Sequence, residues 1–393
     1  MPTFFSHLEC SVPCGAGPSD PRQIHQRCVC GAPLLARYDL TAARRWPKST
    51  LAGREASMWR YREILPLLQS PKGLDAAVSL GEGWTPLVRA RRLGATLSLR
   101  RLYVKDEGLN PTGSLKARGF SAALTRAMHV GVRGVAVAAA GLAAPAAAAY
   151  SARAALSAKI FTPKDVRRSF VADSELHGAE IAQVDGTLAD AERAAEAFAS
   201  QSSCYDLSAL HEPYRVEGQK TIGYEIAEQL GWELPDWILC PVGSGSTFIG
   251  IWKAFVEMAS LGWIDPVRRP HMVAIQPAGC APIVRAVAAS AEHAEPWSAD
   301  AIRTLADDLR VPDPAGAALV LRAIRESSGS AVGAGDTEMV TEMKTLAKLE
   351  GLSAAPGAGA AVHALRVLAG EGRIKPHDTV VIVNPATAGP YAS

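Results

Sequence analysis

Short apolar runs that alternate with helix-length segments constrain the fold of this chain more than any other feature. The runs that follow this pattern are Val135–Val137, Ile160–Phe161, Ile181–Val184, Trp237–Leu239, Met272–Ile275 and Thr379–Val383. Parallel strands need long crossover connections, and helices usually supply them. The alternation therefore predicts a layered α/β protein with largely parallel sheets. We also expect residues 41–68 to be helical.

The composition is that of a globular chain long enough for two lobes, with 393 residues, of which 48% are hydrophobic and 20% charged. A formal net charge of +2 gives no reason to expect nucleic acid or a membrane surface as a partner. The longest uncharged run, residues 134–152, is mostly alanine and is interrupted by Gly141 and Pro145. It predicts a strand and a close-packed helix rather than a membrane span. No secretory signal segment is visible, so we expect a cytoplasmic protein.

Lys116 is the candidate catalytic residue. It follows the turn-forming sequence Asn110–Gly113, in which proline fixes φ and glycine tolerates a positive φ. Ser114 is placed to cap the helix that follows. Lys116 would then lie in the first helical turn, where the helix dipole disfavours a cation and favours the neutral amine that a Schiff-base lysine needs. An ordinary surface lysine is the alternative.

A glycine-rich turn after the run Trp237–Leu239 is a candidate anion site. Gly243 and Gly245 would let the backbone approach an oxyanion, and three hydroxyl groups would add donors at the start of the next helix: Ser244, Ser246 and Thr247. Taken alone, the same sequence could form a tight structural turn. Together with the lysine segment it favours a phosphate-binding role.

The segment Lys105–Gly119, KDEGLNPTGSLKARG, resembles the cofactor-lysine segment of threonine synthases. These belong to the fold-type II (tryptophan synthase beta-like) pyridoxal-phosphate enzymes. Leu115 stands where the family usually has Phe. The resemblance extends, in the family's order and spacing, to Ser79–Leu87, Glu212–Thr221, Pro241–Ser246 and Ala278–Arg285.

The resemblance implies a fold and a set of roles. It implies two three-layer α/β lobes: a large cofactor-binding lobe at residues 46–108 and 186–393, and a small mobile lobe at 109–185. It makes Lys116 the cofactor lysine, assigns the glycine turn to the phosphate of pyridoxal phosphate, and places Arg215, Ser114 and Thr112 at the substrate. The guanidinium of Arg215 suits bidentate phosphate recognition, whereas a solvated or salt-bridged arginine is the alternative.

The family reaction converts O-phosphohomoserine into threonine and phosphate by γ-elimination and β-hydration, with the lysine amine acting as base and acid. The resemblance thus implies a carbon–oxygen lyase, a homodimer, that uses an amino-acid substrate carrying a phosphate.

Three positions depart from the family pattern. Leu142 stands where the family has an Asn that contacts the phenolic oxygen of the cofactor, and Pro385 stands where it has a Thr or Ser beside the pyridine nitrogen. Thr387 could replace that hydroxyl if the loop shifts. Asp307 and Asp308 put negative charge where we would expect accommodation of an anionic substrate or cofactor.

Four cysteines near the amino terminus resemble the zinc-ribbon-like extension of some threonine synthases, and we assign the extension to residues 1–45. Four thiolates, Cys10, Cys14, Cys28 and Cys30, could close a tetrahedral zinc site. Their spacing is looser than in the usual knuckle, so reduced, unliganded cysteines are the alternative. Cys204, Cys240 and Cys280 lie in apolar surroundings and are expected to be core residues.

Two functions remain open from the sequence. One is a diverged pyridoxal-phosphate lyase or replacement enzyme with an altered amino-acid substrate, which retention of Lys116, the glycine turn and Arg215 favours. The other is a non-catalytic relative that keeps the fold and binds the cofactor for another purpose, which Leu142 and Pro385 favour.

Overall fold

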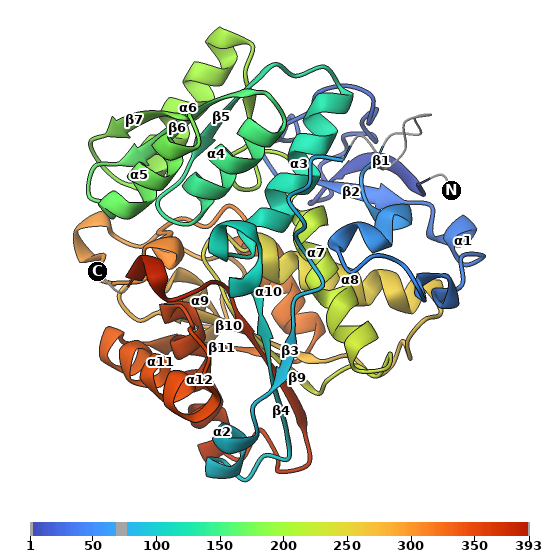
Figure 1. Ribbon diagram of the computed structural model, residues 1–393, viewed down its shortest axis with the longest axis vertical. Helices are drawn as coiled ribbons and strands as arrows, with labels where there is room; N and C mark the ends of the chain where they lie inside the picture. The colour runs from blue at the N-terminus through green and yellow to red at the C-terminus, as the bar shows by residue number, and fades with distance from the viewer. Residues whose placement is uncertain (1–2, 68–76, 392–393) are drawn as a thin grey trace. The chain divides into compact units, whose positions relative to one another are not determined.

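The computed structural model describes residues 3–67 and 77–391, and the chain divides into two compact units (Figure 1). Unit 1 contains residues 1–84, 116–222 and 256–263, and unit 2 contains residues 85–115, 223–255 and 264–393. Both units are built on sheets of mainly parallel strands, so the predicted α/β class is confirmed. The predicted small mobile lobe at 109–185 concerns motion and stays a prediction.

A six-stranded sheet forms the centre of unit 2. In spatial order its strands are β11 (Ser330–Ala334), β10 (His271–Pro277), β9 (Trp237–Pro241), β12 (Thr379–Asn384), β4 (Arg101–Asp106) and β3 (Leu87–Arg89). All neighbouring pairs are parallel except β3 and β4. Every residue of β9 and β12 is buried, as expected for central strands covered on both faces.

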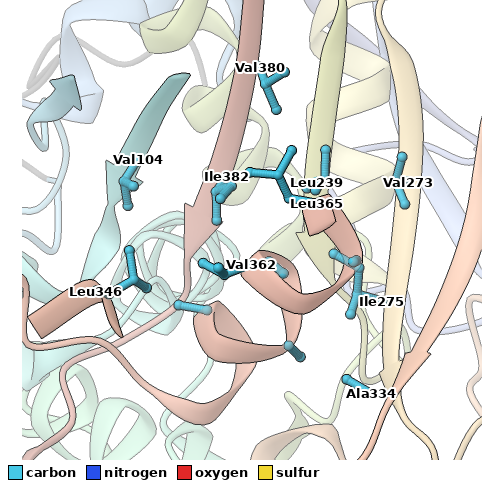
Figure 2. Close-up of a cluster of buried hydrophobic side chains, with 14 of the residues drawn as sticks. Val104, Leu239, Val273, Ile275, Ala334, Leu346, Val362, Leu365, Val380 and Ile382 are labelled. Atoms are coloured by element: carbon cyan, nitrogen blue, oxygen red, sulfur yellow. The ribbon is translucent and has the colours of Figure 1, made fainter. Parts of the chain in front are cut away.

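Branched side chains from this sheet pack against α12 (Pro356–Gly370) and α11 (Asp336–Glu350), as Figure 2 shows. Val380 and Ile382 on β12 alternate toward Val362 and Leu365 on α12, and all four are fully buried. Burying side chains of this size stabilises the fold by about 1.5–3 kcal/mol each. This core fixes the strand ends that carry the candidate site of unit 2.

Unit 1 contains a parallel four-stranded sheet. Its spatial order is β7 (Glu180–Val184), β6 (Ser157–Pro163), β5 (Gly134–Ala138) and β8 (Tyr205–Asp206). Alanines of α6 (Leu188–Ser202) pack against β5 and β6, and a capping box of Thr187 and Asp190 starts this helix. All six strand runs expected from the sequence are therefore confirmed.

The alanine-rich run forms β5 and then α4 (Ala143–Arg153), as predicted. Among the described residues, none of the helices combines the length and the apolar character that crossing a membrane requires. The remaining helices are α2 (Arg91–Thr96), α3 (Lys116–His129), α5 (Arg168–Leu176), α7 (Arg215–Gln229), α8 (Ser246–Leu261), α9 (Pro282–Ala288) and α10 (Ala317–Glu326).

The amino-terminal extension is an antiparallel pair, β1 (Phe5–Cys10) and β2 (Leu34–Tyr38). The expectation of a helix over residues 41–68 is largely wrong. The chain forms only α1 (Leu40–Ala43) and two 3₁₀ segments, Lys48–Leu51 and Met58–Ile64, while residue 68 lies outside the described part. Its apolar residues are buried by tertiary packing without regular helical spacing.

Candidate active site and cysteine cluster

The candidate residues of unit 2 follow three neighbouring strands. The segment containing Thr112 and Ser114 leaves β4, the segment from Pro385 leaves β12, and the glycine turn leaves β9. These strands are parallel and adjacent, so all three segments emerge at the same edge of the sheet. The carboxyl edge of a parallel sheet is where α/β proteins place ligands. Unit 2 therefore brings these residues together.

The turn at Asn110–Gly113 is confirmed, because the Gly113 amide donates to the Asn110 carbonyl at 2.9 Å. Thr112 has φ +61°, a left-handed conformation that is costly for a β-branched residue and is found mostly where function requires it. The hydroxyls of Thr112 and Ser114 are buried and have no hydrogen-bond partner among the described residues. The expectation that Ser114 caps α3 is thus wrong. Both hydroxyls have unused hydrogen-bonding capacity.

The segment after β12 runs antiparallel to this turn. The amide of Thr387 donates to the Gly113 carbonyl at 3.0 Å, and the amide of Leu115 donates to the Pro385 carbonyl at 2.9 Å. The Thr387 hydroxyl lies 3.4 Å from the hydroxyl of Ser353. Pro385 offers no side-chain donor, and Thr387 is therefore the residue of this pair with a hydroxyl near the turn.

Buried Asn384 fixes the end of β12. Its amide donates to the Asp106 carboxylate at 2.7 Å, so β12 and β4 end at a shared polar contact. Burial raises the pKa of Asp106, although the hydrogen bonds from Asn384 and the Gly108 amide oppose the shift. This contact positions the two strand ends from which the Pro385 and Thr112 segments leave.

The glycine turn connects β9 to α8 directly. Gly245 has φ +99°, and a Cβ on Gly243 would lie 2.7 Å from the main-chain oxygen of Asp308, so glycine is required at both positions. Ser246 begins α8 and is buried, and its hydroxyl lies 3.4 Å from that of Ser244. Backbone N–H groups at a helix start, together with hydroxyl donors, suit a phosphate.

Lys116 lies in unit 1 at the first residue of α3, so its predicted place in the first helical turn is confirmed. The helix crosses α7 closely: a Cβ on Gly218 would lie 1.9 Å from the Arg118 carbonyl oxygen. Leu142 is buried in the same unit, directly before α4. Its side chain provides packing and no hydrogen bond.

Arg215 lies at the start of α7, after β8. The adjacent strand β5 is parallel to β8, so the loops that carry Arg215 and Leu142 leave the same edge of the unit 1 sheet. The guanidinium donates from Nη1 to the Leu207 carbonyl at 2.8 Å and lies 4.3 Å from the centre of the Phe120 ring. Within the described chain its Nε has no acceptor. A donor therefore remains for an anion.

Glu212 caps this helix. Its carboxyl accepts the amides of Tyr214, at 2.6 Å, and of Arg215, at 3.0 Å. Burial raises the pKa of Glu212 to about 7, although the charge of Arg215 and the two amides oppose the shift. Burial also lowers the pKa of Arg215, against the effect of Glu212.

The sequence analysis did not identify a row of side chains beside Arg215. Asp206 and His211 are buried, with His211 Nδ1 2.6 Å from Asp206 Oδ2, and Arg27 contacts the other ring nitrogen of His211. Asp206 and His211 have a local signal, because they flank the loop before Arg215. Arg27 has none, because it lies 184 positions away in the sequence.

The four amino-terminal cysteines form one cluster in unit 1. Their sulfur atoms all lie within 4.8 Å of one another, with Cys10 to Cys30 at 3.5 Å and Cys14 to Cys28 at 3.6 Å. Four sulfurs placed tetrahedrally about 2.3 Å from zinc would be about 3.8 Å apart, so the cluster fits this ion. The separations are too long for disulfides. Cys240 and Cys280 are buried as predicted, and Cys204 is half-buried.

Comparison with known proteins decides the family. The description "Pyridoxal-phosphate dependent enzyme" matches residues 78–386. The chain belongs to this family. It is threonine synthase-like: it is 36% identical to the threonine synthase of Methanosarcina acetivorans over 96% of this chain and 90% of that protein. The threonine synthase of Methanocaldococcus jannaschii is also 36% identical, over 96% of this chain and 91% of that protein.

Solved structures show the same fold. A maize serine racemase has a TM-score of 0.64 at 21% identity and covers 77% of this chain and 88% of its own. A threonine deaminase from T.th. has a TM-score of 0.63 at 22% identity, covering 77% and 92%. The predicted fold-type II architecture is thus confirmed.

Proposed function

We propose that this pyridoxal-phosphate enzyme is a carbon–oxygen lyase that acts on an amino acid carrying an anionic leaving group, with O-phosphohomoserine as the reference substrate. The proposal is supported most by the unused donors of Thr112, Ser114 and Arg215, which are located on segments that leave the carboxyl edges of the two sheets. Threonine synthase is the name of its relatives with 36% identity. A non-catalytic role is not favoured, because this similarity covers 96% of the chain.

The glycine turn supports cofactor binding. In the proposal, the amides at Gly243–Thr247 and the hydroxyls of Ser244, Ser246 and Thr247 hold the phosphate of pyridoxal phosphate. Lys116 holds the cofactor covalently as the Schiff-base lysine. When bound, the cofactor supplies an electron sink for charge that develops on the substrate carbon atoms. Leu142 and Pro385 would lie at the ring without donating to it, and Thr387 is the residue that could offer it a hydroxyl.

The remaining roles concern the substrate. Lys116 takes the proton from the α carbon and transfers protons at the β carbon, while phosphate leaves the γ carbon and water adds at the β carbon. Arg215 holds the phosphate of the substrate, and the hydroxyls of Ser114 and Thr112 orient the substrate. Each role rests on the geometry of the residue within its own unit.

Trapping the cofactor tests the assignment of Lys116. Holoenzyme reduced with borohydride and digested with protease should give one modified peptide, with the label on Lys116. Lys116→Ala should lose both the label and phosphate release from O-phosphohomoserine. Label on another lysine, or no cofactor uptake at excess pyridoxal phosphate, would refute the proposal.

We also infer that the cysteine cluster holds one structural zinc ion. Elemental analysis should find about one zinc per chain, and Cys28→Ser with Cys30→Ser should remove it and lower the melting temperature. Cys204→Ser is the matched control, because this cysteine lies outside the cluster. A metal-free preparation of unchanged stability would mean that the four are ordinary thiols.

The homodimer and the cytoplasmic location are further parts of the proposal. The resemblance supports the first, and sedimentation equilibrium of the holoenzyme tests it. Fractionation of the source cells tests the second.

A further inference from the structure

The amino-terminal extension contacts the chain on both sides of Arg215. Each contact joins one residue of the extension to one residue of the segment 205–217. The pairs are His25 with Tyr205, Arg27 with His211, Phe5 with Tyr214 and Tyr38 with Glu217. The hydroxyl bonds of Tyr205 and Tyr38 measure 2.7 and 2.8 Å. All these residues belong to unit 1.

The contact of Arg27 continues into the interior through His211. The ring of His211 is 2% exposed and Asp206 is fully buried, so both side chains are fixed by their partners. Burial would raise the pKa of Asp206, but hydrogen bonds from His211 and Ser208 hold it below its ordinary value. The ionised carboxylate accepts Nδ1–H, which leaves Nε2 as the acceptor for Arg27.

Asp206 in turn shapes the loop that holds Arg215. Its Oδ1 accepts the Ser208 amide at 2.8 Å, and the Ser208 hydroxyl accepts the Ala138 amide of β5 at 2.9 Å. Between these anchored residues lies Leu207, whose carbonyl accepts Nη1 of Arg215. The guanidinium is therefore held by a carbonyl whose position depends on Asp206.

We propose that Arg27 and His211 are positioning residues for Arg215, and that metal binding by the cysteine cluster strengthens phosphate binding through them. This inference rests on the proposed role of Arg215. Arg27 directly precedes Cys28, so a metal that fixes Cys28 also fixes the start of the Arg27 side chain. The loop from Cys14 to Cys28 contains little regular structure, and a metal would supply much of its order. Arg27 itself is exposed, and its guanidinium needs an anchored backbone to stay on His211.

Variants of Arg27 test the positioning role. In holoenzyme, Arg27→Met should raise the Kd for inorganic phosphate and the KM for O-phosphohomoserine by about fivefold to tenfold, and kcat should change less than about twofold. Arg27→Lys keeps a donor and should restore most of the affinity. His211→Gln should weaken phosphate binding similarly. Arg22→Met is the matched control, because Arg22 lies in the same loop and pairs with Asp20.

Amide hydrogen exchange over residues 205–216 tests the metal link without any activity. Chelation of zinc from the wild type should raise exchange there severalfold and weaken phosphate binding by the factor seen for Arg27→Met. In Arg27→Met itself, chelation should change phosphate affinity less than about twofold, because the link is already broken. An equal effect of chelation in both proteins would overturn the link through Arg27.

The two proposals fail in different ways. A wild type that does not release phosphate from O-phosphohomoserine, but whose phosphate affinity depends on Arg27, refutes the reaction and supports the positioning role. An active enzyme with unchanged phosphate affinity, KM and exchange in Arg27→Met overturns the positioning role and leaves the reaction standing.

Discussion

At the scale of single residues, the departures at Leu142 and Pro385 are predicted to weaken threonine synthase activity. Leu142→Asn and Pro385→Thr should each raise kcat/KM for phosphate release from O-phosphohomoserine by about twofold to tenfold, because each adds one hydrogen bond to the cofactor ring. Both act on one conjugated ring, so the double variant should exceed the product of the single changes.

Two outcomes would contradict this prediction. The wild type could already turn over O-phosphohomoserine efficiently, or the double variant could lose the cofactor. Cofactor absorbance and melting temperature are the controls, since Leu142 is 2% exposed and a buried amide costs about 1–3 kcal/mol without partners. The Pro385 ring packs near Gly357, where a Cβ would lie 3.0 Å from it, and threonine is no larger than this ring.

The raised pKa of Glu212, about 7, predicts a pH dependence of stability. Between its unfolded and folded pKa values the folded state retains a proton that the unfolded state has lost. The stabilisation is present below the unfolded pKa and is lost as pH rises through about 7. Glu212→Gln should therefore abolish a loss on the order of 2 kcal/mol in unfolding free energy between low and neutral pH.

Urea unfolding at a series of pH values measures this change. Glu196→Gln, at an exposed carboxyl of α6, is the control and should leave the pH profile unchanged. The lowered pKa of Asp206 acts in the opposite direction, with stability lost as pH falls, and remains in both variants. An unchanged profile in Glu212→Gln would contradict the prediction.

At the scale of elements, the turn between β9 and α8 should tolerate no side chain at Gly245. Gly245→Ala forces alanine to φ +99° and brings Cβ within 2.8 Å of Val320, so pyridoxal-phosphate affinity should fall at least about tenfold. Gly351→Ala is the matched control, because Gly351 also has positive φ, at +71°, but has open space around it. Cofactor titration by absorbance would contradict the prediction if both variants bound equally.

Elements with a strong apolar pattern were predictable, and those formed by tertiary packing were not. Buried runs such as Trp237–Leu239 are strands because β-branched and aromatic residues suit a covered sheet. Residues 41–64 contain similar residues, but Pro47 and Gly53 interrupt them, and 3₁₀ turns form instead. The motif of Lys116 could be read locally. The row Arg27–His211–Asp206 could not, because it joins segments that are remote in sequence.

At the scale of the whole molecule, local charge matters more than the net charge of +2. Arg215 supplies a cationic group in unit 1. In unit 2 the turn at Asp307–Leu309 lies against the glycine turn, and the Tyr391 hydroxyl donates to Asp308 at 2.5 Å. A negative charge near a phosphate cradle opposes a dianionic substrate, and salt screens such an effect.

Removing this charge should therefore favour phosphorylated substrates. Asp307→Ser with Asp308→Gly should lower the KM for O-phosphohomoserine by about threefold to tenfold at low salt, and the gain should shrink at high salt. O-acetylhomoserine, whose leaving group is uncharged in the ester, is the matched substrate, and its KM should change less than about twofold. Tyr391→Phe keeps both carboxylates and separates loss of charge from loosening of the turn. If Tyr391→Phe lowers the KM as much as the double variant, or if both substrates gain equally, the effect arises from the shape of the turn and the electrostatic prediction is wrong.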